Sequence, residues 1–476
     1  MRSLMSFAVA GLLLGGCRKW EDHNALQDPL LDKDIFTLIS GDANLSSFAG
    51  LLVKSGYDKV LTSSKTFTVF APVNTALSAL DPAIVNDTAR LRLFVGSHIA
   101  GSLYYTSPAA AGQRIPMLNK KYHNVQGNNV EDAHITAADK YCKNGVLQVI
   151  DKMMPALPNT WEFVETNNLM PSAQKSYLLS IFANVFDVTN AVQIGYDSAG
   201  RPMYQPGTDS VRTNLFWRNV HDLRNEKKQY TFFALANSTW DAEVTKYKPF
   251  FVTGTADSTA SLALWEVVKD FAVDTLYSSS AAIPDTILSK FNTKMGIEKS
   301  AVVQTVRTSN GIVYIMSKLD VLPRHKFKPI QIEAENYSFT SADRRGNTYF
   351  RDRVNTLTGA GFRDVLVWNH GLALFNLGYR INGMPSLKYR AYWVAVHDNI
   401  NGLTTTFTQK LGIGIPNSTV FGFTTVNLNN YQEVLIGEFT LATYQPQYNI
   451  YLTAANNTTA ATNAIVCDYI RLEPVL

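Results

Sequence analysis

The chain has 476 residues, of which 46% are hydrophobic and 17% are charged. This composition excludes extensive disorder and collagen-like repeats, and the length predicts about three domains, each able to bury its own core. The 43 basic and 39 acidic side chains are mixed along the sequence, so no basic footprint for nucleic acid is visible and no nucleic-acid partner is expected.

The chain begins with a pattern that indicates targeting rather than folding. Arg2 precedes an apolar run over residues 7–14, which is too short to cross a bilayer as a mature helix. The run ends in Leu14-Gly15-Gly16-Cys17, which resembles the lipobox of bacterial lipoproteins. The resemblance implies a signal peptide at 1–16, acylation of Cys17 and a lipidated tether at 17–33, so that membrane lipid holds the chain. An ordinary secretory peptide with an incidental Cys17 is the alternative.

A short charged segment follows the lipobox. Arg18-Lys19-Trp20-Glu21-Asp22 resembles the lysine-plus-acidic export tags of lipoproteins in Gram-negative bacteria that carry SusC/SusD systems. The resemblance implies a lipid-anchored, surface-exposed protein of the outer membrane, with SusC/SusD-like proteins as partners. Beyond Cys17 only Cys142 and Cys467 remain. They fall in different predicted domains, so buried thiols are expected rather than a disulfide.

Residues 34–158 show a helical pattern followed by a strand and a further helix. Apolar residues between Ile35 and Tyr57 recur at steps of three and four, which predicts helices. Residues 66–70 alternate as a strand of β-branched and aromatic residues, and Asn74 is placed to cap the helix after it. Asn144-Gly145 predicts a tight turn before a closing strand, because both residues tolerate a positive φ angle.

Three segments of this region, 68–77, 93–101 and 144–152, resemble the signatures of fasciclin-like domains. The resemblance implies a compact α/β fold at 34–158, with a helical cap over a β core, and a role in adhesion or in contact with matrix and carbohydrate. His98 lies in the second segment. We expect it to be a hydrogen-bonded residue that bridges strand and helix rather than a catalytic base.

A second copy of the pattern predicts another fasciclin-like domain at 159–326. Residues 230–240 stand in the place of the first signature, and residues 310–316 stand in the place of the last. Leu235 replaces the proline of the signature, and Phe271 stands where the first copy has His98. Residues near 195–226 have no counterpart in the first copy and carry Pro and Gly, so they predict an insertion exposed at the surface.

Residues 327–476 predict an all-β sandwich. Leu387, Tyr389, Ala391 and Trp393 fall on one face of a run with a period of two, while polar residues fall on the other face. Similar runs occur around residues 434–440, 448–453 and 465–472, without a long helical pattern between them. We expect one face of each strand, including Trp393, to be buried.

The ends of this region resemble the opening and closing strands of family-six-type carbohydrate-binding modules, on residues 332–337 and 467–472. Such modules are galactose-binding-like jelly rolls, and the resemblance implies a structural Ca²⁺ held by Glu333, Glu335 and Asp468. Carboxylate oxygens are the ligands that this cation prefers. The alternative is that these carboxylates pair with neighbouring arginines such as Arg471.

The predicted sugar site depends on aromatic rings. The family usually has a Trp after the Gly of a mid-domain segment, but Leu372 follows Gly371 here. Other aromatic residues can supply a flat face for a pyranose ring. The candidates for ligand binding are Tyr349, Trp368, Tyr379 and Tyr392.

No motif for a nucleophile elbow, a phosphate-binding loop or a zinc site occurs in the sequence, so no enzyme activity is expected. The fold class is two α/β fasciclin-like domains followed by an all-β jelly-roll sandwich. We expect a non-catalytic surface lipoprotein that acts in adhesion or binds a polysaccharide or glycoprotein, as an accessory to a SusC/SusD-like uptake system. A structural subunit of a transporter that binds protein rather than sugar, and an unrecognised glycan hydrolase, are the alternatives.

Overall fold

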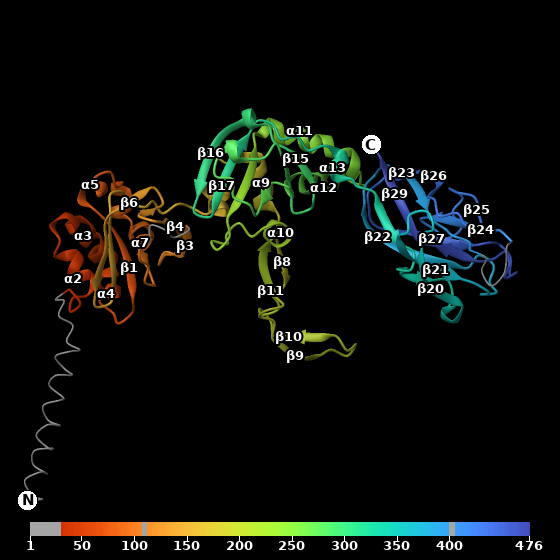
Figure 1. Cartoon of the computed structure of the whole chain (residues 1–476), viewed down its shortest axis with the longest axis horizontal. Helices are drawn as coiled ribbons and strands as arrows, with labels where there is room; N and C mark the ends of the chain where they lie inside the picture. The colour runs from red at the N-terminus through yellow and green to blue at the C-terminus, as the bar shows by residue number, and fades with distance from the viewer. Residues whose placement is uncertain (1–29, 107–111, 399–404) are drawn as a thin grey trace, which may run out of the picture.

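The computed structural model describes residues 30–106, 112–398 and 405–476, so Cys17 and the charged segment after it lie outside the described residues. Three units follow one another along the chain (Figure 1): a first unit at 35–150, a second unit at 160–316 and a sandwich unit at 330–475. Among the described helices, none is long and apolar enough to cross a membrane.

The first unit packs short helices against one sheet with the strand order β2-β1-β7-β6-β5-β4-β3. Its helices are α2 (Ile35–Ser40), η1 (Ala43–Leu45), α3 (Ser46–Ser55), α4 (Tyr57–Leu61), α5 (Asn74–Leu77), α6 (Pro82–Asn86) and α7 (Thr88–Gly96). Its strands are β1 (Phe67–Pro72), β2 (Ile99–Ala100), β3 (Gln113–Pro116), β4 (Tyr122–Gln126), β5 (Asn129–Val130), β6 (Ala133–Cys142) and β7 (Gly145–Ile150).

The second unit has a smaller sheet with the strand order β13-β12-β17-β16 and three two-stranded sheets, β9-β10, β8-β11 and β14-β15. Its helices are α8 (Thr160–Thr166), α9 (Ser172–Ser180), α10 (Leu215–Asn219), α11 (Asn237–Tyr247), η2 (Lys248–Phe251), α12 (Ala256–Val268), η3 (Ser280–Ala282) and η4 (Lys299–Ala301). Its strands are β8 (Phe182–Phe186), β9 (Gln193–Tyr196), β10 (Pro202–Tyr204), β11 (Ser210–Asn214), β12 (Tyr230–Leu235), β13 (Ala272–Val273), β14 (Thr286–Leu288), β15 (Lys294–Gly296), β16 (Val302–Thr308) and β17 (Gly311–Met316).

The two units repeat one topology. In the first, β1 pairs in parallel with β7 from Phe67↔Gly145 onwards. In the second, β12 pairs in parallel with β17 from Tyr230↔Gly311 onwards. In both units a short antiparallel strand flanks the parallel pair on one side and a long antiparallel strand flanks it on the other. The repeated α/β fold predicted from the sequence is therefore confirmed.

A buried asparagine occupies the same place in each repeat. The Oδ1 atom of Asn144 accepts from Ile35 N at 2.9 Å, and its Nδ2 atom donates to the carbonyl of Leu61 at 2.6 Å. Asn310 accepts from Thr160 N at 2.8 Å and donates to the carbonyl of Leu223 at 2.9 Å. Each asparagine thus joins the first helix of its unit, the loop before the central strand and the start of the closing strand.

The glycine after each asparagine is required for a reason other than the predicted one. Neither Asn144 nor Gly145 is among the described residues with a positive φ angle. A Cβ atom on Gly145 would instead collide with the carbonyl oxygen of Phe67 in the neighbouring parallel strand, and one on Gly311 would collide with that of Tyr230. The glycines therefore allow two backbones to approach closely.

His98 is buried and acts as a structural link. Its Nε2 atom accepts from Met154 N at 2.9 Å, and its Nδ1 atom lies 2.9 Å from the carbonyl of Phe94. Burial lowers the pKa of His98 to about 3, so the ring is neutral. Phe271 holds the equivalent place in the second unit, because the His98 carbonyl accepts from Phe70 N and the Phe271 carbonyl accepts from Phe233 N.

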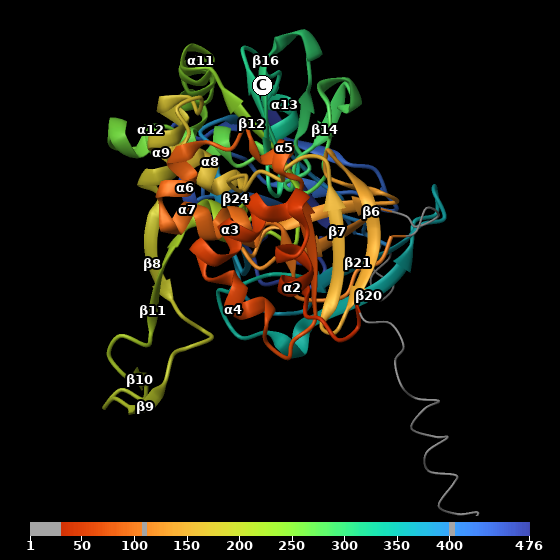
Figure 2. The same ribbon diagram turned by 90° about the vertical axis from the view of Figure 1, so that its left-hand side faces the viewer.

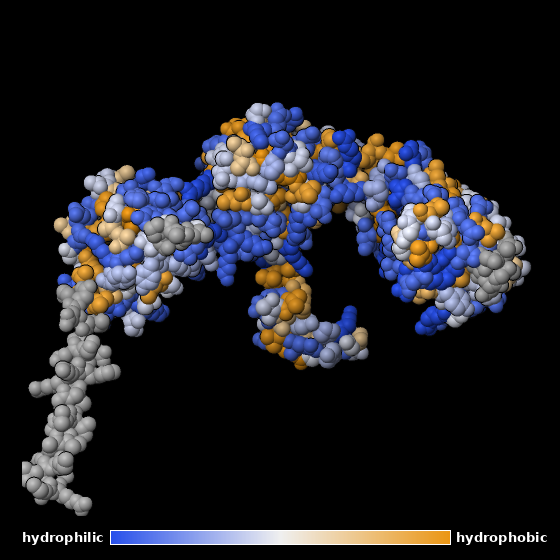
Figure 3. Space-filling view, viewed as in Figure 1, coloured by the Kyte–Doolittle hydropathy of each residue, from blue (hydrophilic) through white to orange (hydrophobic). Residues whose placement is uncertain are grey.

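The insertion in the second unit lies earlier than the predicted 195–226. Gly56 alone separates α3 from α4 in the first unit, whereas residues 181–214 separate α9 from α10 in the second. Phe216, Val220 and Leu223 are buried in the core, so the end of the predicted insertion belongs to the body of the unit. Residues 181–214 form a ribbon, here called the arm, that projects from the second unit (Figure 2) and carries apolar side chains at its surface (Figure 3).

The described strands of the sandwich unit pair in the antiparallel sense, in the sheet orders β18-β29-β23-β26, β19-β22-β27-β24-β25 and β20-β21-β28, and an isolated parallel bridge joins His397 to Leu428. Trp393 is buried, as predicted. Cys467 of this unit and Cys142 of the first unit are both free and buried. The helices are α13 (Pro323–Lys326), which precedes the sheets, and η5 (Arg345–Asn347). The strands are β18 (Ile330–Glu333), β19 (Phe339–Thr340), β20 (Thr348–Val354), β21 (Gly361–Val367), β22 (Asn376–Met384), β23 (Lys388–Trp393), β24 (Phe407–Ile413), β25 (Thr424–Val426), β26 (Val434–Thr440), β27 (Gln445–Ala454), β28 (Ile465–Cys467) and β29 (Tyr469–Val475).

The sandwich unit is packed onto the second unit through apolar contacts. The buried apolar residues of both units form one continuous cluster, whereas those of the first unit form clusters of their own. The rings of Phe250 and Phe327 lie 4.7 Å apart. Two backbone hydrogen bonds cross the junction, from Tyr444 N to the Val252 carbonyl at 2.7 Å and from Ser386 N to the Phe250 carbonyl at 2.8 Å.

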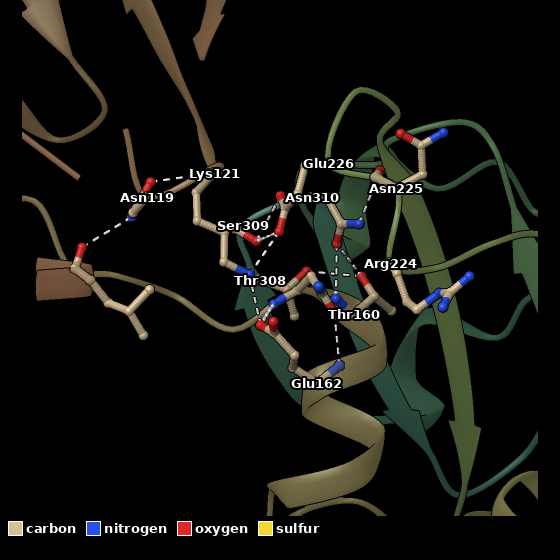
Figure 4. Close-up of polar contacts among 12 residues, drawn as sticks. Asn119, Lys121, Thr160, Glu162, Arg224, Asn225, Glu226, Thr308, Ser309 and Asn310 are labelled. Carbon is tan, nitrogen blue, oxygen red and sulfur yellow. Dashed lines mark hydrogen bonds and ion pairs between the residues drawn. The ribbon is translucent and has the colours of Figure 1, made fainter. Parts of the chain in front are cut away.

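The first and second units are joined by ion pairs. Lys121 of the first unit reaches Glu162 at 2.7 Å and Glu226 at 2.8 Å, both in the second unit (Figure 4). Arg307 of the second unit pairs in return with Glu131 and, at 2.8 Å, with Asp132 of the first. Each unit thus supplies a cation that the carboxylates of the other unit hold.

Replacing Gly145 with Ala tests the close approach of β1 and β7. We expect Gly145→Ala to lower the free energy of unfolding of the first unit by at least about 2 kcal/mol, because backbone must move to admit the methyl group. Chemical denaturation followed by far-UV circular dichroism measures the change. Gly50→Ala, in the interior of α3 with open space around its Cβ position, is the control and should be neutral or stabilising. Equal effects of the two substitutions would contradict the explanation.

Candidate functional site

The four aromatic residues predicted to bind ligand do not come together. Tyr349 lies on β20, Trp368 follows β21, Tyr379 lies on β22 and Tyr392 lies on β23. These strands belong to three different sheets. The sequence identified aromatic residues of the sandwich unit, but their positions do not form one platform.

Their individual environments also differ. Tyr379 is only 1% exposed and donates its hydroxyl to the Ala334 carbonyl at 2.8 Å, so it is a core residue and offers no face to a ligand. The guanidinium of Arg471 lies 4.3 Å from the ring centroid of Tyr392 and covers that ring. Trp368 is half-buried against the core. Tyr349 is 45% exposed and is the most open of the four.

A different set of side chains forms an aromatic surface with arginines around it. The rings of Tyr337 and Phe350 stack with centroids 6.3 Å apart and an interplanar angle of 20°. The guanidinium of Arg380 lies 6.0 Å from the ring centroid of Phe339, and that of Arg363 lies 5.9 Å from Phe350. We call these residues, together with Arg344 and Arg345, the aromatic–arginine face.

The local sequence explains how this face is built. Tyr337 lies two residues before the start of β19, and Phe339 is the first residue of β19. Phe339 pairs with Gly378 of β22, and its ring lies where a Cβ atom on Gly378 would stand. The absence of a side chain at Gly378 therefore seats the Phe339 ring against the sheet.

The face borders a shallow cavity of about 350 Å³. Arg345 forms an ion pair with Asp343 at 2.7 Å. Arg344 donates to the carbonyls of His370 and Asp343 instead, and no carboxylate among the described residues pairs with Arg344 or Arg380. The lining residues are Tyr337, Phe339, Thr340, Ala342, Asp343, Arg344, Arg345 and Thr348.

This arrangement suits a sugar that carries negative charge. Aromatic faces pack against the C–H edges of a pyranose ring, and a few polar groups then fix its orientation. Arginine donates paired hydrogen bonds to carboxylate or sulfate oxygens. Because no carboxylate in the described part of the chain forms an ion pair with Arg344 or Arg380, their charge is available to an anionic group.

The carboxylates predicted to bind calcium come from the two ends of the sandwich unit's sequence and lie near one another in space. Burial, together with the charges of Glu333, Asp364 and Glu335, raises the pKa of Asp468 to about 7. One carboxylate oxygen of Glu335 is buried without a hydrogen-bond partner in the described structure. Oxygen ligands of this kind fit Ca²⁺ in chemistry. However, the described residues contain no group of three His, Cys, Asp or Glu side chains arranged to hold a metal ion, so calcium stays a prediction.

The alternative interpretation named Arg471 as a partner of these carboxylates, and that pairing is wrong. Arg471 pairs with Glu433 at 2.7 Å and with Glu473 at 3.5 Å, rather than with Glu333, Glu335 or Asp468. Within the described residues, none of the three forms an ion pair. Asp364 holds the neighbouring arginines, since Arg351 lies 2.6 Å and Arg353 lies 2.8 Å from its carboxylate.

A cavity of about 520 Å³ lies between the first and second units. Lys121 and Arg307 line it, and both are already paired with carboxylates. His123 also lines it and has its Nδ1 atom 3.3 Å from Glu131. The charges here are used to join the units, so the aromatic–arginine face is the stronger candidate for a ligand.

Comparison with known proteins identifies one domain directly. Residues 43–156 match the model of the Fasciclin domain, which covers most of the first unit. No curated protein matches the chain. The second unit is related to the first by the repeated topology described above.

Similar solved structures cover the two parts of the chain separately. A FAS1 domain pair from the insect cell adhesion molecule Fasciclin I is 14% identical, covers 60% of this chain and 99% of its own, and has a TM-score of 0.23. A family 35 carbohydrate binding module from Clostridium thermocellum is 14% identical, covers 31% of this chain and 100% of its own, and has a TM-score of 0.21. The module CsCBM6-3 from Clostridium stercorarium, in complex with cellobiose, is 13% identical. It covers 31% of this chain and 94% of its own, and has a TM-score of 0.19.

Asp468 gives the sandwich unit a pH dependence of known sign. Its pKa is raised above the ordinary value of 3.8, so the stability it contributes is present at low pH and is lost as the pH rises through about 7. Without calcium, we expect Asp468→Asn to stabilise the unit by about 1–2 kcal/mol at pH 8, allowing for solvent screening, and to have little effect at pH 5. Denaturation at both pH values measures this.

Calcium and a control residue make the test specific. Added Ca²⁺ should raise the melting temperature of the unaltered chain at pH 8 and leave that of Asp468→Asn unchanged. Asp352→Asn, an exposed carboxylate on β20, should behave like the unaltered chain. A stabilising effect of Asp468→Asn that is the same at pH 5 and pH 8 would argue against a raised pKa.

Proposed function

We propose that this protein is a non-catalytic, lipid-anchored lipoprotein of the outer membrane that binds an acidic glycan at the cell surface. In this proposal Cys17 carries the acyl chains, and the two fasciclin-like units hold the sandwich unit away from the membrane. The protein would act in adhesion or as an accessory to a SusC/SusD-like uptake system. The Fasciclin domain at 43–156 supports an adhesive role.

The observation that carries the proposal is the aromatic–arginine face of the sandwich unit. Aromatic rings beside Arg344 and Arg380, with which no described carboxylate forms an ion pair, are chemically suited to a polysaccharide with carboxylate or sulfate groups. Phe350 is 46% exposed, and exposed aromatic rings are more costly to leave in water than polar side chains. The ring offers a face to a sugar of any charge, and the arginines favour a carbohydrate that carries negative charge.

Binding to polysaccharides of opposite character tests this proposal. We expect isothermal titration calorimetry of the chain from residue 18 onwards to show binding to polygalacturonate or heparin, and at least tenfold weaker binding to a neutral galactan. The double variant Phe350→Ala/Arg380→Ala should weaken the acidic interaction at least tenfold, which is about 1.4 kcal/mol. Binding should also weaken as salt is added.

A matched pair of substitutions on another sheet controls for general effects. Leu435 is exposed on β26, and Arg390 is exposed on β23. Leu435→Ala/Arg390→Ala therefore removes one exposed apolar residue and one arginine away from the face, and it should bind like the unaltered chain. Unchanged affinity in the Phe350→Ala/Arg380→Ala variant would refute the proposed site.

The anchor has its own test. Cys17→Ala removes the thiol that the lipobox would present for acylation, so we expect the variant to move from the membrane fraction to the soluble fraction. Immunoblotting of fractionated cells measures the distribution, and Cys142→Ala, at a buried thiol, serves as the control. Membrane association that survives Cys17→Ala would sink the lipoprotein proposal.

A further inference from the structure

A buried lysine and a buried aspartate meet at the end of the second unit, next to the start of the sandwich unit. Lys326 is the last residue of α13, and Asp270 lies between α12 and β13. The Nζ atom of Lys326 lies 2.5 Å from the Oδ2 atom of Asp270, and the two side chains are only 1% and 0% exposed. Among the ion pairs of the described residues, this one is the most deeply buried.

The other carboxylate oxygen of Asp270 is held by a serine. The hydroxyl of Ser289 donates to Oδ1 of Asp270 at 2.5 Å. The same hydroxyl oxygen accepts from Phe291 N at 3.1 Å and from Thr293 N at 3.2 Å. A hydroxyl has a single proton, so these two amides leave it directed at Asp270. A donor fixed in this way stabilises negative charge that develops on a carbonyl oxygen during attack on its carbon.

A second carboxylate stands beside the lysine. Oε1 of Glu266 lies 3.8 Å from Nζ of Lys326, while Oε2 of Glu266 is held by Lys269 at 2.6 Å. Lys326 also donates to the backbone carbonyl of Glu266. The centroid of the buried Tyr247 ring lies 5.0 Å from Nζ of Lys326. An amine, a carboxyl carbon, a hydrogen-bond donor and a proton carrier are thus gathered in a site that is shielded from water.

Both the position and the burial of the pair favour a reaction between its members. Oδ2 is bonded to Cγ of Asp270, so Nζ of Lys326 also lies close to that carbon. A nucleophile held beside its target reacts far faster than the same groups free in solution. Two opposite charges are costly to keep inside a protein even when they are paired. Condensation to an amide removes both charges.

We propose that Lys326 and Asp270 form an intramolecular isopeptide bond. The bond between Nζ and Cγ forms, and the bond between Cγ and Oδ2 breaks. The ammonium group gives up two protons, and both leave with Oδ2 as one water molecule. Glu266 carries a proton from Nζ to the departing oxygen, and Oδ1 remains as the amide oxygen under the hydroxyl of Ser289. The reaction consumes no oxidant, reductant or other partner.

The bond ties the connection to the sandwich unit directly to the end of α12. It closes a loop over residues 270–326, which contains β13, β14, β15, β16 and β17. Such a loop restricts the unfolded chain in the way that a disulfide does. A pull on the sandwich unit then passes from α13 to α12 without loading these strands, which suits a protein that holds a ligand under force.

Electrospray mass spectrometry of the denatured chain from residue 18 onwards tests this proposal. We expect the mass to lie below the mass calculated from the sequence by one water molecule. Tandem mass spectrometry of a proteolytic digest should show the Lys326 peptide joined to the Asp270 peptide. A mass equal to the calculated one overturns the proposal, and so does a loss of water that maps to an aspartate not linked to Lys326.

Substitutions assign the roles of the residues. Lys326→Arg keeps a positive charge but removes the amine, so it should have its full calculated mass, and a loss of water that persists in this variant overturns the proposal. Glu266→Gln should also keep its full mass while its circular dichroism spectrum shows that it folds, and complete cross-linking in it would overturn the role of Glu266. Lys246→Arg is the matched control and should still lose water. Lys246 lies 2.6 Å from Glu243 and 5.2 Å from the Tyr247 ring centroid, but it is 33% exposed.

Discussion

The hydrogen bonds of one buried asparagine in each repeat fix the framework on which the rest of the molecule is built. Asn144 and Asn310 each satisfy a backbone amide at the start of the first helix and a backbone carbonyl before the central strand. Buried polar groups are costly unless they are paired, so these amides tie three distant segments to one geometry. Asn310 lies in the turn between β16 and β17, so its position also sets where Arg307 of β16 stands relative to the first unit.

The two junctions of the chain are held by different forces. The junction between the first and second units depends on Lys121 and Arg307. The pair of Arg307 with Asp132 is exposed and is therefore weakened by salt, whereas the side chains of Lys121 and Glu226 are each only 12% exposed, so salt screens that pair less. The junction between the second unit and the sandwich unit depends on apolar rings such as the half-buried Phe250 and the buried Phe327, and salt does not weaken their contact. The second and sandwich units therefore share one apolar core, whereas ion pairs join the first unit to the second.

The sequence was sufficient for the repeat and for the fold class, because the strands 67–72 and 145–150 carry strong local patterns that recur at 230–235 and 311–316. The sequence did not show why position 145 requires glycine. The requirement arises from the close approach of the Phe67 backbone, which lies far from Gly145 in the chain. The end of the insertion was misplaced for a similar reason. Residues around Phe216 look irregular in sequence, but they fill the place that α4 fills in the first unit.

Residue type alone could not separate core aromatics from surface aromatics in the sandwich unit. Tyr379 and Tyr349 are the same type of residue, and the sequence does not tell them apart. Packing buries Tyr379 on β22 and leaves Tyr349 on β20 exposed. The Tyr337-Ser338-Phe339 alternation and the adjacent Arg344-Arg345 pair were a readable signal for the aromatic–arginine face, but Arg380 and Phe350 join it only through strand pairing.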